Sequence, residues 1–300
     1  MTKATDQVQP PLKVMGLGEF RAQSFPRKIE ILSPWMTSKS LSMIYAQRGV
    51  GKTHLIISAC LTVAGGGDLL GWHTERPRRV LHVDSEMPGV DLQNRYEAAL
   101  RFPGVKRPSS HRLRILSADA QTDAMRDLNT EEGQQDIYDS LGDAEVIVLD
   151  NKSSLCRSGR ENDAEAWTLM QEFLLRLRRE GRSVVLVHHA GKNGSQRGTS
   201  RHEDVLDTVI NLRRPADYSP GDGARFEVHF EKTRGFMGEE AEPFEARLTE
   251  RGWVRGAINN PVAEQILELN KQGLSQRDIG LRVGVSAATV NRILRASKSS

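Results

Sequence analysis

Cysteines, aromatic residues and long hydrophobic runs are scarce in this sequence. Its 300 residues include two cysteines, Cys60 and Cys156, which lack metal-ligand spacing, so we expect both to be reduced in a cytoplasmic protein. No apolar run reaches the roughly 18 residues of a membrane span. The polar segment at the N-terminus lacks the apolar core of a signal peptide. Composition therefore predicts a soluble protein with no membrane partner.

Basic charge is unevenly distributed along the chain. The net charge is +3, but the segment from Arg255 to the C-terminus holds seven Lys/Arg against three Asp/Glu and so contributes +4. The rest of the chain is therefore close to −1. A basic excess at one end suits a nucleic-acid partner. A merely solubilising tail would have the same composition, so charge alone leaves both readings open.

The order of apolar and polar stretches predicts an α/β protein with a small all-α domain at its C-terminus. We expect a flexible leader over residues 1–24, an α/β core over 25–254, a linker over 255–260 and a helical domain over 261–300. Short β-branched runs alternate with helical stretches in the core, which is typical of a mostly parallel sheet covered by helices. The expected strands are Leu41–Tyr45, Arg79–Val83, Arg114–Leu116, Val146–Leu149, Ser183–Val187, Asp207–Leu212 and Arg225–Phe230. Residues 215–224 read as a hairpin turn, whereas residues 116–132 are polar and irregular.

A phosphate-binding loop follows the first of these strands. The segment Gly49-Val-Gly-Lys-Thr53 lies between an apolar strand and a helical stretch, which is the context that a P-loop requires. Backbone N–H groups of such a loop point at phosphates, and the lysine and the threonine hydroxyl serve phosphate and Mg²⁺. The usual first glycine is alanine here. The predicted nucleotide-binding residues are Ala46, Gln47, Arg48, Gly49, Val50, Gly51, Lys52, Thr53 and His54.

Acidic residues end two further expected strands. Asp150 follows Val146–Leu149, and in the context of a P-loop an Asp at this place holds Mg²⁺ together with Thr53. Asn151 follows Asp150, so the carboxylate that activates the attacking water has to come from another segment. We expect Glu86 to be this base, because it lies two residues after Asp84, where the neighbouring strand ends. A helix-capping role for Glu86 is the alternative.

These segments together resemble the RecA/DnaB-like P-loop ATPases, and within them the plasmid RepA-type hexameric helicases and their AAA_25-type relatives. The resemblance spans about residues 30–240. It rests on Gly-Val-Gly-Lys-Thr, Val-Asp-Ser-Glu-Met, Val-Leu-Asp and Val-His-His-Ala. It implies a RecA-like fold, ATP and Mg²⁺ as cofactors, and a homo-oligomer, most often a hexameric ring. It also implies that His188 or His189 senses the γ-phosphate, the alternative being a histidine that only packs.

Two basic segments resemble parts that such rings use between subunits. Gln196-Arg197-Gly-Thr-Ser is similar to a stretch of RepA-type helicases, and Lys232-Thr-Arg234 is similar to the finger of DnaB-like rings. The resemblance implies that Arg197, Lys232 or Arg234 reaches the γ-phosphate of the neighbouring subunit. A solvated strand face would show the same Lys-x-Arg spacing.

The C-terminal residues resemble the helix-turn-helix of resolvase-type DNA-binding domains. Three helices are expected, from Pro261, after Ser275 and after Ser286, with Gly273 and Gly284 between them. The resemblance places the third helix in the major groove of DNA. Its outward residues would be Ala287, Ala288, Thr289, Asn291, Arg292 and Arg295, of which the last four are the predicted DNA contacts. A helical bundle for protein contacts is the alternative.

These features predict an ATP-hydrolysing, DNA-associated motor, similar to the replicative helicases of plasmids, phages or integrated elements. Two other roles fit the same motifs: an ATP-switched DNA-binding regulator or loader that does not unwind DNA, and an ATPase that assists recombination. Only 5% of the residues are aromatic, and no aromatic loop for gripping single strands is evident. This scarcity weighs against the helicase role.

Overall fold

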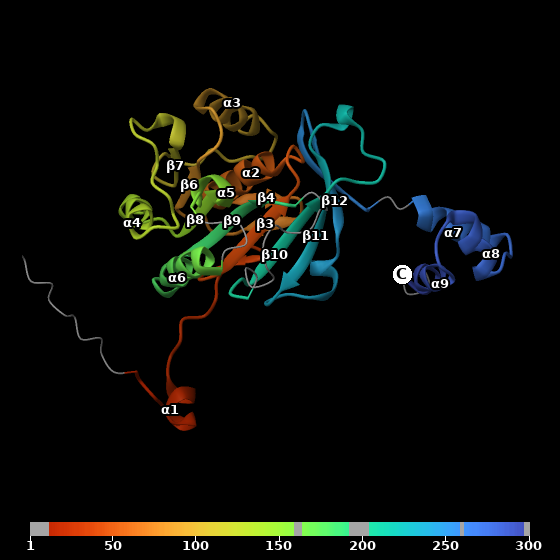
Figure 1. Cartoon of the computed structure of the whole chain (residues 1–300), viewed down its shortest axis with the longest axis horizontal. Coiled ribbons are helices and arrows are strands. Elements are labelled where there is room, and N and C mark those ends of the chain that lie inside the picture. The colour runs from red at the N-terminus through yellow and green to blue at the C-terminus, as the bar shows by residue number, and fades with distance from the viewer. Residues whose placement is uncertain (1–11, 159–163, 192–203, 259–260, 297–300) are drawn as a thin grey trace, which may run out of the picture.

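The computed structural model describes residues 12–158, 164–191, 204–258 and 261–296, arranged as mixed α and β structure (Figure 1). Its strands are β1 (Glu30–Leu32), β2 (Met36–Thr37), β3 (Leu41–Ala46), β4 (Gly67–Leu69), β5 (Trp72–Thr74), β6 (Val80–Asp84), β7 (Leu113–Ser117), β8 (Val146–Asp150), β9 (Ser183–His189), β10 (Thr208–Arg213), β11 (Arg225–Thr233), β12 (Phe244–Thr249) and β13 (Gly252–Gly256). Its helices are α1 (Leu17–Ala22), α2 (Lys52–Gly65), α3 (Gly89–Ala99), α4 (Glu131–Ser140), α5 (Lys152–Leu155), α6 (Ala164–Arg179), α7 (Pro261–Lys271), α8 (Gln276–Val283) and α9 (Ala287–Ala296).

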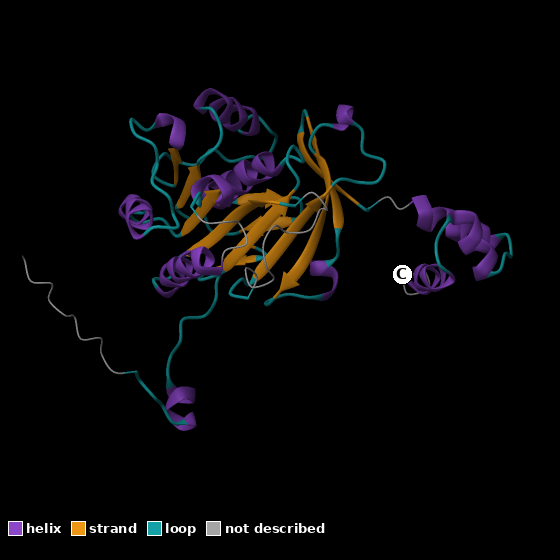
Figure 2. Ribbon diagram, viewed as in Figure 1, coloured by secondary structure: helices purple, strands orange, loops and turns teal. Residues whose placement is uncertain are grey.

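A large twisted sheet forms the centre of the core (Figure 2). Within the described residues it has nine strands in the order β13-β12-β11-β10-β3-β9-β8-β6-β7. The strands from β10 to β7 run parallel, and β11, β12 and β13 extend the sheet by antiparallel pairing. The predicted α/β class with a mostly parallel sheet is therefore confirmed.

Hydrophobic side chains on both faces of the sheet explain why the central strands are apolar throughout. Ile44, Val148 and Val187 belong to a cluster with helix α2 on one face. Met43 and Leu149 belong to a second cluster with helix α6 on the other face. Since both faces of these strands are covered, alternation of polar and apolar residues is lost, as expected for a buried parallel sheet.

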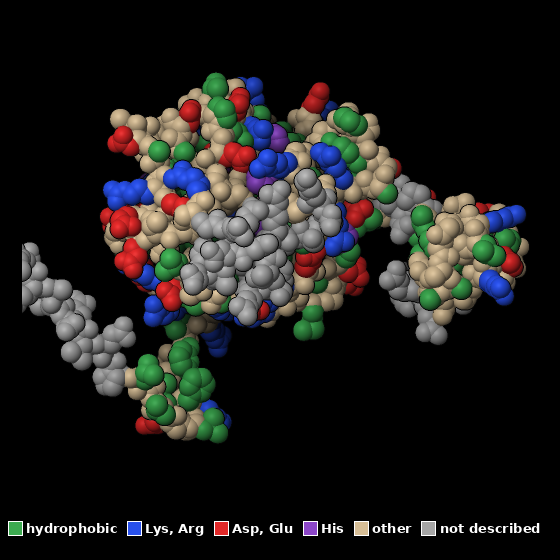
Figure 3. Space-filling model, in the orientation of Figure 1, with side chains coloured by type: hydrophobic (Ala, Val, Ile, Leu, Met, Phe, Trp, Pro, Cys, Tyr) green, Lys and Arg blue, Asp and Glu red, His purple; other side chains and the backbone are tan. Residues whose placement is uncertain are grey.

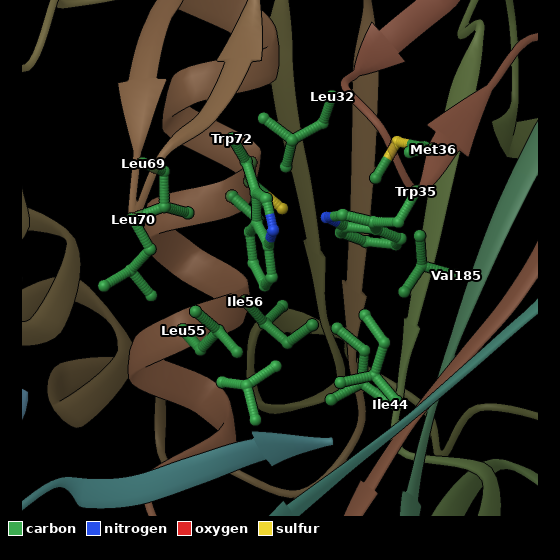
Figure 4. Packing of buried hydrophobic residues seen from close by; sticks show 14 of the residues in the cluster. Leu32, Trp35, Met36, Ile44, Leu55, Ile56, Leu69, Leu70, Trp72 and Val185 are labelled. Carbon is green, nitrogen blue, oxygen red and sulfur yellow. The ribbon is translucent and has the colours of Figure 1, made fainter. Parts of the chain in front are cut away.

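Two short hairpins, β1–β2 and β4–β5, cover the hydrophobic cluster on the α2 face of the sheet. Trp35, after β1, and Trp72, in β5, pack edge to face with ring centroids 5.5 Å apart (Figure 4). Both are almost completely buried and pack with residues of helix α2 such as Leu55 and Ile56. Aromatic pairs in this arrangement add about 0.5–1.5 kcal/mol beyond the area that they bury. The pair ties the hairpins to the helix that follows the P-loop.

All seven predicted strands occur in the sheet, with ends that differ by a few residues. Strands β12 and β13, and the short hairpins, were not predicted. Strand β13 continues through Arg255, which pairs with Ala246, and ends at Gly256, so the first two residues of the predicted linker belong to the sheet. Helix α1 forms inside the predicted leader. Its neighbourhood exposes Leu12, Val14, Leu17 and Phe20, and hydrophobic side chains gather there in Figure 3.

The C-terminal residues form three helices with a small core of their own. Ile266, Ile279 and Val290, one from each helix, are fully buried within one cluster. The Ser275 hydroxyl accepts a hydrogen bond from the Asp278 backbone and so caps α8, and Gly284 ends α8 in the left-handed conformation. These caps are where the sequence predicted them. Among the described helices, none is long and apolar enough to span a membrane.

Candidate functional site

The P-loop connects the buried end of β3 to the first turn of α2. Gly49 and Gly51 adopt φ values of 74° and 116°, which L-residues with side chains rarely adopt. A Cβ at Gly51 would lie 2.8 Å from the Cβ of Ala224 in the β10–β11 hairpin. Ala46, which replaces the usual first glycine, is the last residue of β3 and is completely buried. The two glycines therefore let the loop backbone turn into the N-terminus of α2, where anions are favoured.

Lys52 is the first residue of α2 and lies almost entirely inside the loop. Its Nζ donates hydrogen bonds to the carbonyl oxygens of Ala46 and Gln47, each 3.1 Å away. Burial lowers the pKa of Lys52 to about 8, although the negative charges of Asp150 and Glu86 act in the opposite direction. A phosphate group entering the loop would replace the two carbonyls as a stronger partner for the ammonium.

The acidic ends of β6 and β8 lie side by side. Asp84 and Asp150 are in register on these neighbouring strands, and both are buried. Asp84 accepts hydrogen bonds from the backbone N–H groups of Glu86 and Met87, at 3.3 and 2.9 Å. Burial, followed by the charge of Asp84, raises the pKa of Asp150 to about 7. A divalent cation at this edge would therefore relieve a strong local excess of negative charge.

Glu86, the predicted base, contacts Asn151, which follows β8, and His189, the last residue of β9. Its Oε2 accepts a hydrogen bond from the Asn151 amide and lies 3.3 Å from Nε2 of His189. Half of the Glu86 side chain (55%) is exposed to solvent, which leaves it accessible to water. This position, with its oriented carboxylate, is compatible with the predicted role in activating water.

The two histidines at the end of β9 face opposite sides of the sheet. His189 lies on the same side as Val187 and the P-loop, whereas His188 follows Leu186 toward the α6 side, because side chains alternate along a strand. Only His189 of this pair is among the described residues that line the cavity beside the P-loop, which is described below. Burial is the main cause of its lowered pKa, so its imidazole is neutral near pH 7. The geometry thus selects His189 from the predicted pair.

A cavity of about 570 Å³ joins these groups. Its described lining comes from the P-loop and α2 (Arg48, Gly49, Gly51, Lys52, Thr53, His54), from β6 and α3 (Asp84, Glu86, Met87, Pro88, Asp91, Arg95), from β8 and β9 (Asp150, Asn151, His189) and from the β10–β11 hairpin (Tyr218, Gly223, Ala224). This volume is within the usual range of about 300–1,000 Å³ for small-molecule sites. Burial lowers the pKa of His54 to about 4, so this cavity residue is uncharged.

The β10–β11 hairpin contributes a part of the site that the sequence did not predict. Tyr218 lines the cavity, and the guanidinium of Arg214 stacks on its ring at 4.6 Å. Arg214 also donates a hydrogen bond to the carbonyl of Gly49, at 3.3 Å. The hairpin is therefore attached to the P-loop. Tyr218 could have been found only from the order of the strands, because it belongs to no local motif, whereas Asp84 lies in the Val-Asp-Ser-Glu-Met segment but was given no role of its own.

Two of the predicted finger residues, Lys232 and Arg234, are absent from the described lining of this cavity. Lys232 and Arg234, at the end of β11, both donate to the carbonyl of Asp204, at 3.4 and 2.7 Å. Neither is among the described residues that line the cavity of their own subunit. Arg197 lies outside the described residues. The structure therefore does not bring Lys232 and Arg234 together with Lys52 within one chain.

The predicted DNA contacts are in α9. Ser286 caps this helix by accepting a hydrogen bond from the backbone of Thr289, at 3.2 Å. Ala287 and Ala288 are exposed, and Thr289 and Asn291 are half-buried, whereas Val290 and Leu294 pack inward. Arg292 and Arg295 belong to the same helix, but their side chains lie outside the described part of the structure.

ATP and Mg²⁺ fit the residues that are present. The N–H groups of the P-loop and Lys52 suit the phosphates, and a side chain at Gly51 would clash with the hairpin that shapes the loop. Thr53, at the second position of α2, and Asp150, at the end of β8, offer oxygen ligands of the kind that Mg²⁺ prefers. His54 and His189 add no positive charge to the site at neutral pH.

Comparisons with known proteins identify the family and the fold of this chain. The model of the AAA_25 family, described as an AAA domain, matches residues 9–195. A KaiC-like protein from the hyperthermophilic archaeon Pyrococcus horikoshii is similar in structure, with a TM-score of 0.50 and 14% identity over 75% of this chain and 93% of that one. No curated protein sequence matched the chain. The chain therefore belongs to the AAA_25 family and is a P-loop ATPase with a RecA-like fold.

Proposed function

We propose that this ATPase is a DNA-associated motor of the RepA-like kind, a ring in which ATP is hydrolysed between subunits. The observation that carries the proposal is the separation of the nucleotide cavity from two cationic groups, Lys232 and Arg234, which are absent from its described lining and contact Asp204 instead. The resemblance of the sequence to plasmid RepA-type helicases supports a role in replicating a mobile element.

Within the cavity, the roles follow from position. Lys52 neutralises and positions the phosphates, and Thr53 and Asp150 would hold Mg²⁺, which when bound offsets charge on the transferred phosphoryl group. Glu86 accepts the proton of the attacking water, and Asn151 fixes its orientation. His189 contacts Glu86, so this neutral imidazole links the base to the place where the terminal phosphate would lie.

The buried ammonium of Lys52 leads to a prediction for nucleotide affinity. Lys52→Ala should weaken ATP binding by about 3 kcal/mol or more, roughly a hundredfold, because charge-assisted hydrogen bonds to phosphate are lost.

In the wild type, affinity for ATP should also fall as pH rises through about 8, because the protonated form of Lys52 binds phosphate and its pKa in the free protein is near that value. Titration with a fluorescent ATP analogue at pH 7 and pH 9 measures both effects.

The exposed Arg48→Ala is the matched control for this substitution, since it removes one positive charge from the same loop. It should weaken binding by less than about tenfold and retain the pH dependence. Equal losses for the two variants would contradict a special role for Lys52.

We further propose that α7–α9 form a helix-turn-helix that binds DNA through α9. Its support is the arrangement of α9, which is capped at Ser286, packs Val290 inward and leaves Ala287 and Ala288 exposed. Small residues at the start of a helix allow it to approach base edges closely. Asn291, Arg292 and Arg295 supply side chains that suit adenine, guanine and phosphate.

Removal of residues 257–300 tests this proposal. The shortened chain ends after β13 and should keep its fold and its ATP binding, but its affinity for a mixed-sequence duplex at fixed salt should fall at least about tenfold. Fluorescence anisotropy measures the affinity. A double variant, Arg292→Ala with Arg295→Ala, should reproduce much of the loss. The exposed α8 pair Arg277→Ala with Arg282→Ala is the control of equal charge. Equal duplex affinity of the shortened and full chains would make the helices a protein-contact unit.

A second candidate function is an ATP-switched regulator or loader that binds DNA without unwinding it. The scarcity of aromatic residues favours this candidate, since stacking on aromatic rings is a common way of gripping single strands. Both candidates hydrolyse ATP and bind duplex DNA. Strand displacement from a forked duplex, measured with Mg²⁺ and ATP, separates them: release of the strand supports the motor, and binding without release supports the regulator.

A further inference from the structure

A buried histidine that the roles above do not use lies behind the predicted magnesium ligand Asp150. His82 is the middle residue of β6, two residues before Asp84, and its side chain is fully buried. Val80 and Val148 belong to the hydrophobic cluster on the α2 face. Since side chains alternate along strands, His82, Asp84 and Asp150 all point to this face. The imidazole therefore lies immediately beneath the acidic edge of the site.

Two unpaired polar atoms face each other at this point. His82 Nε2 and Asp150 Oδ2 are 3.9 Å apart, slightly too far for a hydrogen bond. Both atoms are buried, and neither has a hydrogen-bond partner within the part of the chain that the structure describes. Buried polar groups without partners are costly. A rotation of the Asp150 side chain that shortens this distance by about 1 Å would satisfy both atoms.

The other nitrogen of His82 is held by a tyrosine from α3. Tyr96 Oη lies 2.8 Å from His82 Nδ1. If Tyr96 donates to Nδ1, the hydrogen of the neutral ring is on Nε2 and points at Asp150. The reverse order would aim the lone pair of Nε2 at a carboxylate. The first order is therefore favoured.

We propose that His82 is a positioning residue for Asp150, whose Oδ2 it holds through Nε2–H so that the other carboxylate oxygen faces the magnesium ion of bound ATP. Asp150 lines the cavity while its Oδ2 is buried, so its two oxygens can serve two partners. Groups that orient a metal ligand in this way change metal affinity by about 10–100-fold when removed. The inference rests on the proposed magnesium-dependent site.

The test is the magnesium dependence of nucleotide affinity, measured on the full chain with a fluorescent ATP analogue. His82→Phe should raise the Mg²⁺ concentration needed for half-maximal tight binding by about tenfold or more, with magnesium-free affinity changed by less than about twofold. His82→Gln, whose amide N–H can extend toward the position of Nε2, should recover most of the loss. Tyr96→Phe, which leaves the ring without its partner at Nδ1, should show a smaller shift in the same direction.

Val148→Ala is the matched control, because Val148 is in register with His82 on β8 and shares its face of the sheet. It should lower the unfolding temperature and leave the magnesium requirement unchanged. A wild-type magnesium requirement in His82→Phe, or the same shift in Val148→Ala, would overturn the proposal. If His82→Phe does not fold, the magnesium requirements of His82→Gln and Tyr96→Phe test the proposal instead. A wild-type magnesium requirement in both variants would overturn the positioning role of His82.

Two further outcomes separate this inference from its assumptions. Tight Mn²⁺ binding without nucleotide, detected by paramagnetic resonance and lost in His82→Phe, would make His82 a metal ligand and overturn the positioning role. A wild-type protein that binds Mg²⁺ and ATP but fails to hydrolyse it would contradict the proposed motor. The binding experiments on His82 would still give their answer in that case.

Discussion

Replacing Glu86 by glutamine is expected to reduce ATP hydrolysis by about 10²–10⁴-fold while ATP still binds. The amide keeps the size of the side chain but cannot accept a proton from water, and base catalysis of this kind contributes a factor of that order. Single-turnover hydrolysis with excess protein measures the loss, and a fluorescent ATP analogue measures binding.

Asp91→Asn is the matched control, because Asp91 is another carboxylate of the same cavity. It should hydrolyse ATP within about threefold of the wild type, since Asp91 belongs to α3 and does not follow a strand end as Glu86 does. Hydrolysis by Glu86→Gln at the wild-type rate would show that another group activates the water. A loss of binding equal to the loss of hydrolysis would instead assign Glu86 a role in holding the nucleotide.

Arg234→Ala is expected to have the largest effect, a loss of about a thousandfold or more in hydrolysis without loss of ATP binding. An arginine that reaches the neighbouring nucleotide stabilises charge in the transition state, and contributions of 10³–10⁵ are typical of such fingers. Arg234 directly follows β11 and is exposed, and its guanidinium contacts the carbonyl of Asp204 in its own chain rather than the cavity. We therefore expect the loss to arise because Arg234 acts on the nucleotide of a neighbouring subunit, as in the proposed ring.

Mixing experiments distinguish this role from a local one. When Arg234→Ala subunits are mixed with Lys52→Ala subunits, interfaces that combine an intact finger with an intact P-loop should recover part of the activity. Arg247→Ala, which removes an exposed arginine from β12, serves as the control and should hydrolyse ATP normally. Rings shown to be mixed that recover no activity would place the action of Arg234 within its own subunit or outside catalysis.

The fold was predictable where burial leaves a simple pattern. Central strands such as β8 and β9 are covered on both faces, so their sequences are continuous apolar runs that stand out from the helices. Strand β12 escaped prediction because Phe244 and Ala246 alternate with polar residues in a short segment, and β13 exposes most of its residues. Their place is set by the pairing of β12 with β11 and of β13 with β12, which depends on the fold of the whole chain.

The site was predictable where one segment holds all the chemistry. The P-loop depends on the glycines and Lys52 within a single turn, so local sequence was sufficient. Asp84, His82 and Tyr218 become part of the site only because β6 lies beside β8 and the β10–β11 hairpin reaches the P-loop. The choice between His188 and His189 likewise required the direction in which β9 presents its side chains.

Two hydrogen bonds connect β13 to α2 and to the turn between β4 and β5. The indole of Trp253 in β13 donates to the hydroxyl of Ser58 in α2, at 2.8 Å, and Arg255 donates to the carbonyl of Leu70 at 3.0 Å. Helix α2 begins at the P-loop, and β13 is the last strand before the C-terminal helices. A shift of α2 on nucleotide binding would therefore pull on β13, the strand that precedes the C-terminal helices in the chain.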